Sequence, residues 1–189
     1  MFYPDIDVRK VTENVLVKRI RDIDRYAFAI NNVQNVNVAL DRHYQKNYNA
    51  FYKMRQKSET WYKIYYSVFE ENKVINPSFE KILTELYEKT GRIEASFASK
   101  MLATINPKMP VWDKYVLNNL NLKVIRKNKE DRLKNAVNLY YCITEWYKEF
   151  LESDIAQNWI QEFNEVLSDY VWFTSTKKVD FILWCAREG

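Results

Sequence analysis

Apolar residues recur at helical spacing along nearly the whole chain, which indicates an all-α fold. One helical face, for example, carries Phe79, Ile82, Leu83, Leu86 and Tyr87. The chain has only two glycines and four prolines, too few for the regular turns of a β-rich protein. The pattern therefore predicts a single all-α domain over residues 1–189, large enough to form two helical lobes.

The same spacing predicts a series of helices along the chain. Helical patterns cover residues 8–30, 33–72, 77–90, 93–104, 130–151, 155–170 and 177–185. The long pattern at 33–72 is expected to be two helices with a bend at residues 56–58, where Ser58 is a candidate N-cap. Thr174, Ser175 and Thr176 offer N-cap chemistry for the last helix.

Residues 76–120 differ from the rest of the chain because glycine and proline interrupt their helices. Asn76 is the expected N-cap of the first helix, and Gly91, the only internal glycine, is its expected left-handed stop. The helix that follows, over residues 93–104, is rich in alanine and serine. Such short side chains let another backbone approach closely, so we expect this helix to be central and buried.

Two prolines separate this helix from the next one. Pro107 and Pro110 cannot continue a helix, because proline lacks an N–H donor and disfavours helical backbone in the residue before it. A new helix is expected to begin at residues 111–113, and Asp113 supplies its first carboxylate. Aspartate is also a preferred N-cap, so the sequence leaves both a chemical and a structural role open for Asp113.

The stretch from Gly91 to Asp113 resembles the core of the helix-hairpin-helix DNA glycosylase superfamily. It combines a glycine turn, a helix of small residues and the sequence Pro-Val-Trp-Asp at the start of the next helix. The family has a Pro-Val-Asp-like motif there, and its aspartate faces the flipped nucleotide. The closing segment at residues 178–184 is similar to uncharacterised bacterial relatives of that superfamily. The resemblance implies a glycosylase-like multi-helix fold with a hairpin-like segment at residues 76–120 between two lobes.

The resemblance also implies roles for particular residues. The carboxylate of Asp113 would stabilise the positive charge that develops on the sugar as an N-glycosidic bond breaks, or would position a water. Trp112 and Tyr115 would form the pocket for the flipped base. Gly91 and Arg92 would provide the hairpin's contact with a DNA phosphate.

The chain departs from the family pattern at two points. The turn at residues 90–93 has one glycine where the family usually has two, and Glu94 lies in the region where bifunctional members carry a nucleophilic lysine. Lys100, about two turns further along the helix, is a second candidate for chemistry. The departures favour a monofunctional mechanism. They also leave open a non-enzymatic protein that binds nucleic acid or protein.

Charge permits nucleic-acid binding without requiring it, since the net charge is +4. Basic residues are densest just after the helix of Asp113, and duplex DNA is the partner that this position favours. The expected nucleic-acid contacts come from Gly91, Arg92, Lys108, Lys123, Arg126, Lys127 and Lys129. A solvated basic surface remains the simpler interpretation of the same residues.

The sequence predicts no cofactor and no nucleotide. It has no glycine-rich phosphate loop, and no metal-ligand spacing surrounds His43, Cys142 or Cys185. Both cysteines lie in apolar helical patterns and are expected to be buried free thiols. No stretch approaches the roughly 20 apolar residues that cross a bilayer, and the N-terminus lacks a signal pattern. We therefore expect a cytoplasmic protein without a membrane partner.

Two lysines begin the last helix in an unfavourable place. Lys177 and Lys178 lie in its first turn, where positive charge opposes the helix dipole. A phosphate or carboxylate partner would explain this placement.

Overall fold

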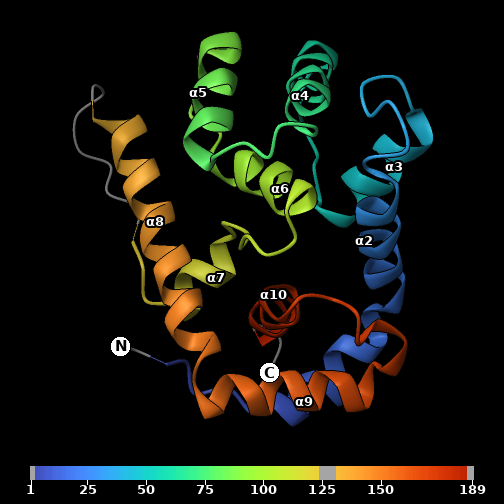
Figure 1. The fold of residues 1–189 in the computed structure, drawn as a ribbon, viewed down its shortest axis with the longest axis vertical. Coiled ribbons are helices and arrows are strands. Elements are labelled where there is room, and N and C mark those ends of the chain that lie inside the picture. The colour runs from blue at the N-terminus through green and yellow to red at the C-terminus, as the bar shows by residue number, and fades with distance from the viewer. Residues whose placement is uncertain (1–2, 124–130, 187–189) are drawn as a thin grey trace. The chain divides into compact units, whose positions relative to one another are not determined.

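A computed structural model describes residues 3–123 and 131–186. All regular secondary structure in these ranges is helical, which confirms the all-α prediction (Figure 1). The chain divides into two compact units. Unit 1 comprises Met1–Arg19 and Pro107–Gly189, and unit 2 comprises Ile20–Asn106.

Unit 2 is built from five α-helices within the described chain. They are α2 (Ile20–Asn32), α3 (Arg42–Phe51), α4 (Glu59–Asn72), α5 (Phe79–Thr90) and α6 (Ala95–Ile105). Within the unit α2 packs against α3, α4 packs against α5, and α6 contacts both α5 and α2 (Figure 1). The small side chains of Ala98, Ser99 and Ala103 are fully buried. This burial confirms that α6 is an interior helix.

Tyrosines form much of the core of unit 2. The hydroxyl of Tyr48 lies 2.6 Å from that of Tyr65, and the Tyr65 hydroxyl donates to the backbone carbonyl of Phe97 at 3.1 Å. Trp61 stacks on Tyr65 with ring centroids 5.0 Å apart. Tyr48 and Tyr65 are completely buried. The aromatic residues of this unit therefore serve mainly as core, and the hydroxyls of Tyr48 and Tyr65 bond within it.

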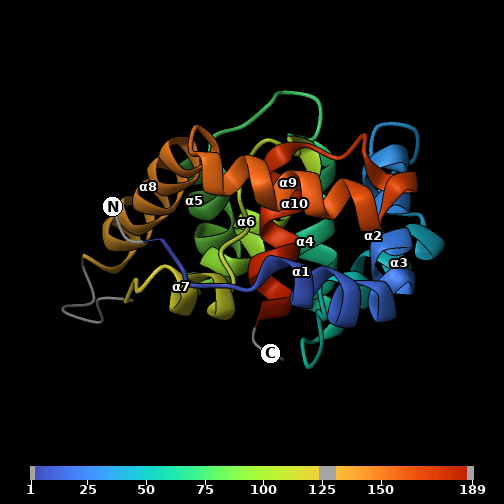
Figure 2. The ribbon, with the colours of Figure 1, turned by 90° about the horizontal axis from the view of Figure 1, so that it is seen from below.

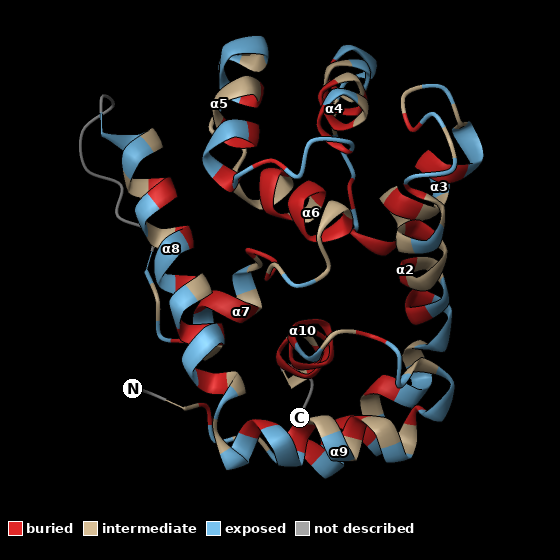
Figure 3. Cartoon of the chain, viewed as in Figure 1, coloured by how far each residue is buried: buried red, intermediate tan, exposed pale blue. Residues whose placement is uncertain are grey.

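Unit 1 is organised around its last helix. Its elements are α1 (Val8–Val11), the π-helical η1 (Thr12–Leu16), the 3₁₀ turns η2 (Val17–Arg19) and η3 (Ser168–Tyr170), α7 (Lys114–Asn119), α8 (Arg132–Leu151), α9 (Asp154–Val166) and α10 (Ser175–Cys185). Helix α10 contacts α1, η1, α7, α8 and α9 (Figure 2). Residues 176–183 are all buried, and Figure 3 shows buried positions around the whole circumference of α10.

Several helix ends agree with the local sequence signals. Gly91 has φ of +67° and ends α5, as predicted. The side chains of Ser58 and Thr174 cap α4 and α10 by accepting backbone N–H groups. The segment predicted at residues 76–120 is shared between the units, because the boundary falls between Asn106 and Pro107. No helix in the described ranges is both long and apolar enough to span a membrane.

Two predicted helix starts were wrong. Asn76 has φ of +46°, and Ser78 caps α5 instead, with its hydroxyl accepting the amide of Lys81 at 3.1 Å. Residues 33–41 are turns rather than helix. Asn37 explains this difference, because its side-chain oxygen accepts the amides of residues 39 and 40 and so competes with helical bonding.

Two further predictions were wrong in part. Residues 8–30 are helical but not one α-helix, since π and 3₁₀ turns join α1 to α2. Cys185 is buried as expected, whereas Cys142 is exposed. The buried face of α8 runs through Tyr140, Ile143 and Trp146, and Cys142 lies just beyond the edge of this face.

Candidate functional site

Asp113 lies at the end of the loop formed by residues 107–113 and at the start of α7. Its carboxylate accepts the backbone N–H of Tyr115 at 2.8 Å, which makes it the N-cap of the helix. The side chain is only partly buried. The N-cap role that the sequence left open for Asp113 is thus present.

Helix α10 holds the first half of this loop through two threonine hydroxyls. Thr174 donates to the carbonyl of Pro107 at 2.5 Å, and Thr176 donates to the carbonyl of Lys108 at 3.1 Å. Both threonines lie at the N-terminal end of α10, and Thr174 also caps that helix. One end of α10 therefore positions the loop.

The second half of the loop is held from α8. Tyr140 on α8 donates its hydroxyl to the carbonyl of Pro110 at 2.9 Å. Three side chains thus bond to the loop backbone within the seven residues that lead to Asp113.

Asp180 belongs to a buried cluster with Lys177 and Tyr147. Its carboxylate accepts the Tyr147 hydroxyl at 2.5 Å and the Lys177 ammonium at 2.8 Å. Lys177 and Tyr147 are each 2 % exposed, and Asp180 is 5 % exposed. Asp180 is therefore the carboxylate partner that explains a lysine in the first turn of α10.

The electrostatics of this cluster follow from its burial. Burial raises the pKa of Asp180, while Lys177, Tyr147 and the amide of Val111 act in the opposite direction. Burial and the neighbouring charge of Asp180 hold the pKa of Tyr147 well above its ordinary value, and Asp113 adds to that effect. Asp113 is therefore within electrostatic reach of the buried cluster.

The two residues predicted to receive a base differ in accessibility. Trp112 is 7 % exposed, so its ring offers little surface to a ligand. Tyr115 is partly exposed, and the Lys114 ammonium lies 5.7 Å from the centre of its ring. Of the two rings, Tyr115 is the one that a flipped base could reach without rearrangement.

The predicted hairpin contacts belong to unit 2, whereas Asp113 belongs to unit 1. The amide of Gly91 donates to the carbonyl of Tyr87 at 2.8 Å, and the amide of Arg92 donates to the hydroxyl of Thr90 at 3.2 Å. These backbone groups thus bond within the turn itself. Gly91 and Arg92 are both exposed to solvent.

Lys100 is also part of unit 2, and its ammonium has structural contacts. It donates to the carbonyl of Tyr52 at 3.3 Å and lies 5.1 Å from the ring centre of Phe97. Glu94, in the region of the family's nucleophilic lysine, pairs with Lys57 at 2.6 Å. The Lys57 ammonium is in turn 4.7 Å from the same Phe97 ring. These contacts give both lysines a role in packing.

The remaining predicted basic contacts lie partly in the described structure. Lys108, in the loop of Asp113, and Lys123, after α7, are both exposed. Arg126, Lys127 and Lys129 lie outside the described residues.

Sequence reasoning missed the residues that hold the loop. The helical pattern at residues 130–151 predicts an apolar face for this helix, but it assigns no hydrogen bond to Tyr140, Tyr147 or Asp180. A signal was available, because Lys177 and Asp180 are three residues apart on one helix, a spacing that lets opposite charges pair. Opposite charges at this spacing in an otherwise apolar helix therefore indicate a buried ion pair, even where no motif is present.

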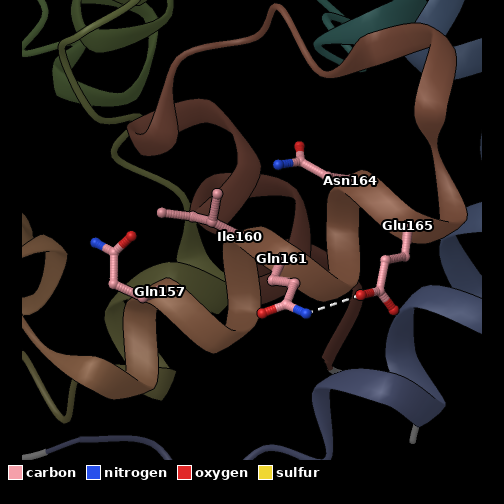
Figure 4. A pocket seen from close by; sticks show the side chains of 5 residues that line it. All are labelled: Gln157, Ile160, Gln161, Asn164 and Glu165. Carbon is pink, nitrogen blue, oxygen red and sulfur yellow. Dashed lines mark hydrogen bonds between the residues drawn. The ribbon is translucent and has the colours of Figure 1, made fainter.

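The surface of α9 carries a separate shallow hollow (Figure 4). Its lining comes from Gln157, Ile160, Gln161, Asn164 and Glu165, and Gln161 donates to Glu165 at 2.9 Å. The lining is amide-rich. Among the residues that the structure describes, no three histidine, cysteine, aspartate or glutamate side chains form a group that could hold a metal ion.

Comparisons of this chain with models of known families, with curated proteins and with solved structures found no match. Function is therefore argued from the geometry of the Asp113 loop and from the chemistry of its residues.

Proposed function

We propose that this protein binds DNA and cleaves N-glycosidic bonds as a monofunctional glycosylase, with Asp113 as its electrostatic or water-positioning group. The observation that supports the proposal is the anchored loop. Thr174, Thr176 and Tyr140 all bond to the backbone that leads to Asp113. Electrostatic catalysis needs a charge that is already in place before the reaction, and such supporting bonds are how proteins hold one.

The proposed reaction is the hydrolysis of a nucleoside bond. Water adds to the sugar carbon, the carbon–nitrogen bond breaks with its electron pair, and the base leaves with a proton derived from that water. Positive charge develops on the sugar during this step, and the carboxylate of Asp113 would lie beside it. Tyr115, which is partly exposed, would contact the extruded base.

Phosphate contacts would come from exposed basic side chains. Lys108 is in the same loop as Asp113, and Lys123 follows α7 in the same unit. Neutralising phosphates releases counterions, so binding should weaken as salt rises. The proposal gives Lys100 no chemical step, because its ammonium contacts the Tyr52 carbonyl and the Phe97 ring.

A specific observation favours the alternative of a non-enzymatic binding protein. Asp113 caps α7, and this use of a carboxylate requires no substrate. The amides of Gly91 and Arg92 bond within their own turn, unlike the phosphate-binding amides of the resembled family. Under this alternative the anchored loop would present a fixed binding surface without chemistry.

Two substitutions at Asp113 separate capping from catalysis. Asn is as good an N-cap as Asp, so Asp113→Asn should leave stability nearly unchanged while removing the charge. Asp113→Ala removes both the N-cap and the charge, and it should lower the free energy of unfolding by about 1 kcal/mol. We expect both variants to lose excision of damaged bases from duplex oligonucleotides. Full excision by a stable Asp113→Asn variant would refute the assigned role.

Binding to duplex DNA containing an abasic-site analogue tests the DNA part of the proposal. The wild type should prefer this duplex over an undamaged one, and Asp113→Asn should keep that preference. Reversing the charges of Lys127 and Lys129 should weaken binding and its dependence on salt. Asp41→Asn is the matched control, because Asp41 caps α3 in unit 2 by accepting the Tyr44 amide at 2.9 Å. No preference in the wild type would favour the non-enzymatic alternative.

A further inference from the structure

The loop before Asp113 is anchored differently in its two halves. The first half, residues 107–109, is bonded by the two threonines of α10 and is partly exposed. The second half, residues 110–112, is buried throughout. In this half the carbonyl of Pro110 accepts the hydroxyl of Tyr140 at 2.9 Å. Of the three side chains that bond to the loop, Tyr140 is therefore the one bonded closest in sequence to the candidate carboxylate.

We infer that Tyr140 is a positioning residue for Asp113, because its hydroxyl fixes the carbonyl of Pro110 three residues before the carboxylate. The inference deepens the proposed function and rests on it for its catalytic meaning. The structural part, that the Tyr140 hydroxyl fixes the placement of Asp113, can be measured without any activity.

The surroundings of the bond between Tyr140 and Pro110 leave the loop few alternatives. Tyr140 is 3 % exposed, and Pro110 is buried as well. Proline has a ring-locked φ and no N–H, so the carbonyl is the only polar backbone group through which Pro110 can be held. A buried carbonyl that loses its donor is destabilising. Without the hydroxyl, the loop should therefore move until this carbonyl finds another donor or water.

Such a movement should reach Asp113. Two buried residues, Val111 and Trp112, are all that separate the bonded proline from Asp113. Close packing leaves these two side chains little room to absorb a displacement. The Asp113 carboxylate in turn accepts the amide of Tyr115 at 2.8 Å. Loss of the distant hydroxyl should therefore weaken the bond between this carboxylate and the Tyr115 amide.

The substitution Tyr140→Phe in the full-length chain tests the inference, because it removes the hydroxyl and keeps the ring. Tyr48→Phe is the matched control, since it removes the buried hydroxyl bond to Tyr65 in unit 2. Both variants lose one buried hydrogen bond and should lose comparable stability in urea unfolding. If Tyr140→Phe is too unstable, all variants are measured in sucrose, which favours the folded state.

The first readout is hydrogen exchange at the amide of Tyr115. Relative to the wild type, Tyr140→Phe should speed this exchange by about tenfold or more, whereas Tyr48→Phe should leave it within a few fold. Thr176→Val removes the bond to the Lys108 carbonyl in the exposed half of the loop and should have a smaller effect. Equal exchange rates in Tyr140→Phe and Tyr48→Phe would overturn the inference.

The second readout is the excision of damaged bases from duplex oligonucleotides. A displacement of about 1 Å in a catalytic group can cost about 100-fold in rate. Tyr140→Phe should therefore lower kcat by up to about 100-fold while it keeps wild-type binding to the abasic-analogue duplex. Tyr48→Phe should change neither. A loss of binding in parallel with kcat would indicate a purely structural role and would overturn the inference.

The two readouts separate the inference from the proposed function. If the wild type excises no base, the proposed function fails, and exchange at the Tyr115 amide still decides whether Tyr140 fixes the placement of Asp113. If the wild type excises bases and Tyr140→Phe does so at the wild-type rate, the positioning role fails while the proposed function stands.

Discussion

The two units bury polar groups in different ways. In unit 2 the tyrosine core contains neutral hydroxyls, as where Tyr48 and Tyr65 bond to each other, and each ion pair of buried Asp22 or Lys73 has a more exposed partner. In unit 1 the interior of α10 contains an ion pair between Lys177 and Asp180. Neutral hydroxyls can donate and accept hydrogen bonds among themselves within an aromatic core. A buried charge is destabilising unless all of its bonding partners are present.

The two units also differ in which parts of the chain their buried polar groups contact. The tyrosine bonds of unit 2 connect helices, for instance Tyr52 to Thr104 at 2.9 Å. The charged cluster of unit 1 lies on α10, the helix whose Thr174 and Thr176 bond to the loop of Asp113. Three experiments test how the two units differ.

The largest expected effect is alkaline loss of stability in unit 2. Burial raises the pKa of Tyr44, Tyr48, Tyr65 and Tyr66 well above 10, so the folded state keeps protons that the unfolded state releases. Stability is fully present below pH 10 and falls as pH rises above it. Above pH 10, each retained proton lowers the free energy of unfolding by about 1.4 kcal/mol per pH unit. Four such protons together lower it by several kcal/mol.

Tyrosinate absorbance and circular dichroism, followed together from pH 9 upward, would check this prediction. We expect the buried tyrosines to ionise only as helix is lost. Tyr66→Phe should move the transition to higher pH, because one proton fewer is released. Ionisation of these groups at ordinary pKa values, with the helices intact, would contradict the assigned burial.

The next largest effect concerns the ion pair of unit 1. Lys177→Met leaves the buried Asp180 carboxylate without its cation and should cost about 3–5 kcal/mol of unfolding free energy. Adding Asp180→Asn should restore much of that loss, because no buried charge then remains unpaired. Urea unfolding of the two single variants and the double variant measures the coupling. Additive losses would show that the two residues act independently.

The smallest effect separates two tyrosines of unit 2. The hydroxyl of Tyr44 is buried without a hydrogen-bond partner among the described residues, so Tyr44→Phe should stabilise the protein by about 1 kcal/mol. Tyr48→Phe removes the bond to Tyr65 and should destabilise it by about 1 kcal/mol. Chemical unfolding of this matched pair checks the signs. Equal effects would mean that hydroxyl bonding does not distinguish the two positions.

Local signals in the sequence were sufficient for most helix ends. Ser58, Gly91 and Thr174 each act within about four residues of their own position, so no distant contact is needed to read them. The start of α5 differs from the prediction, because Asn76 has a positive φ and Ser78 is the residue that caps the helix. The N-cap role of Asp113 was likewise readable from its neighbours.

Only the tertiary structure determined how Asp113 is held. The carbonyl of Pro107 is bonded by Thr174, and that of Pro110 by Tyr140, across 67 and 30 residues of sequence. Helical periodicity says which face of a helix is apolar, but it does not say which distant backbone group a hydroxyl or carboxylate will meet. Local sequence signals were therefore sufficient for most helices and for the cap at Asp113. The packing of α8 and α10 decided that the loop ending at this cap is anchored from the core.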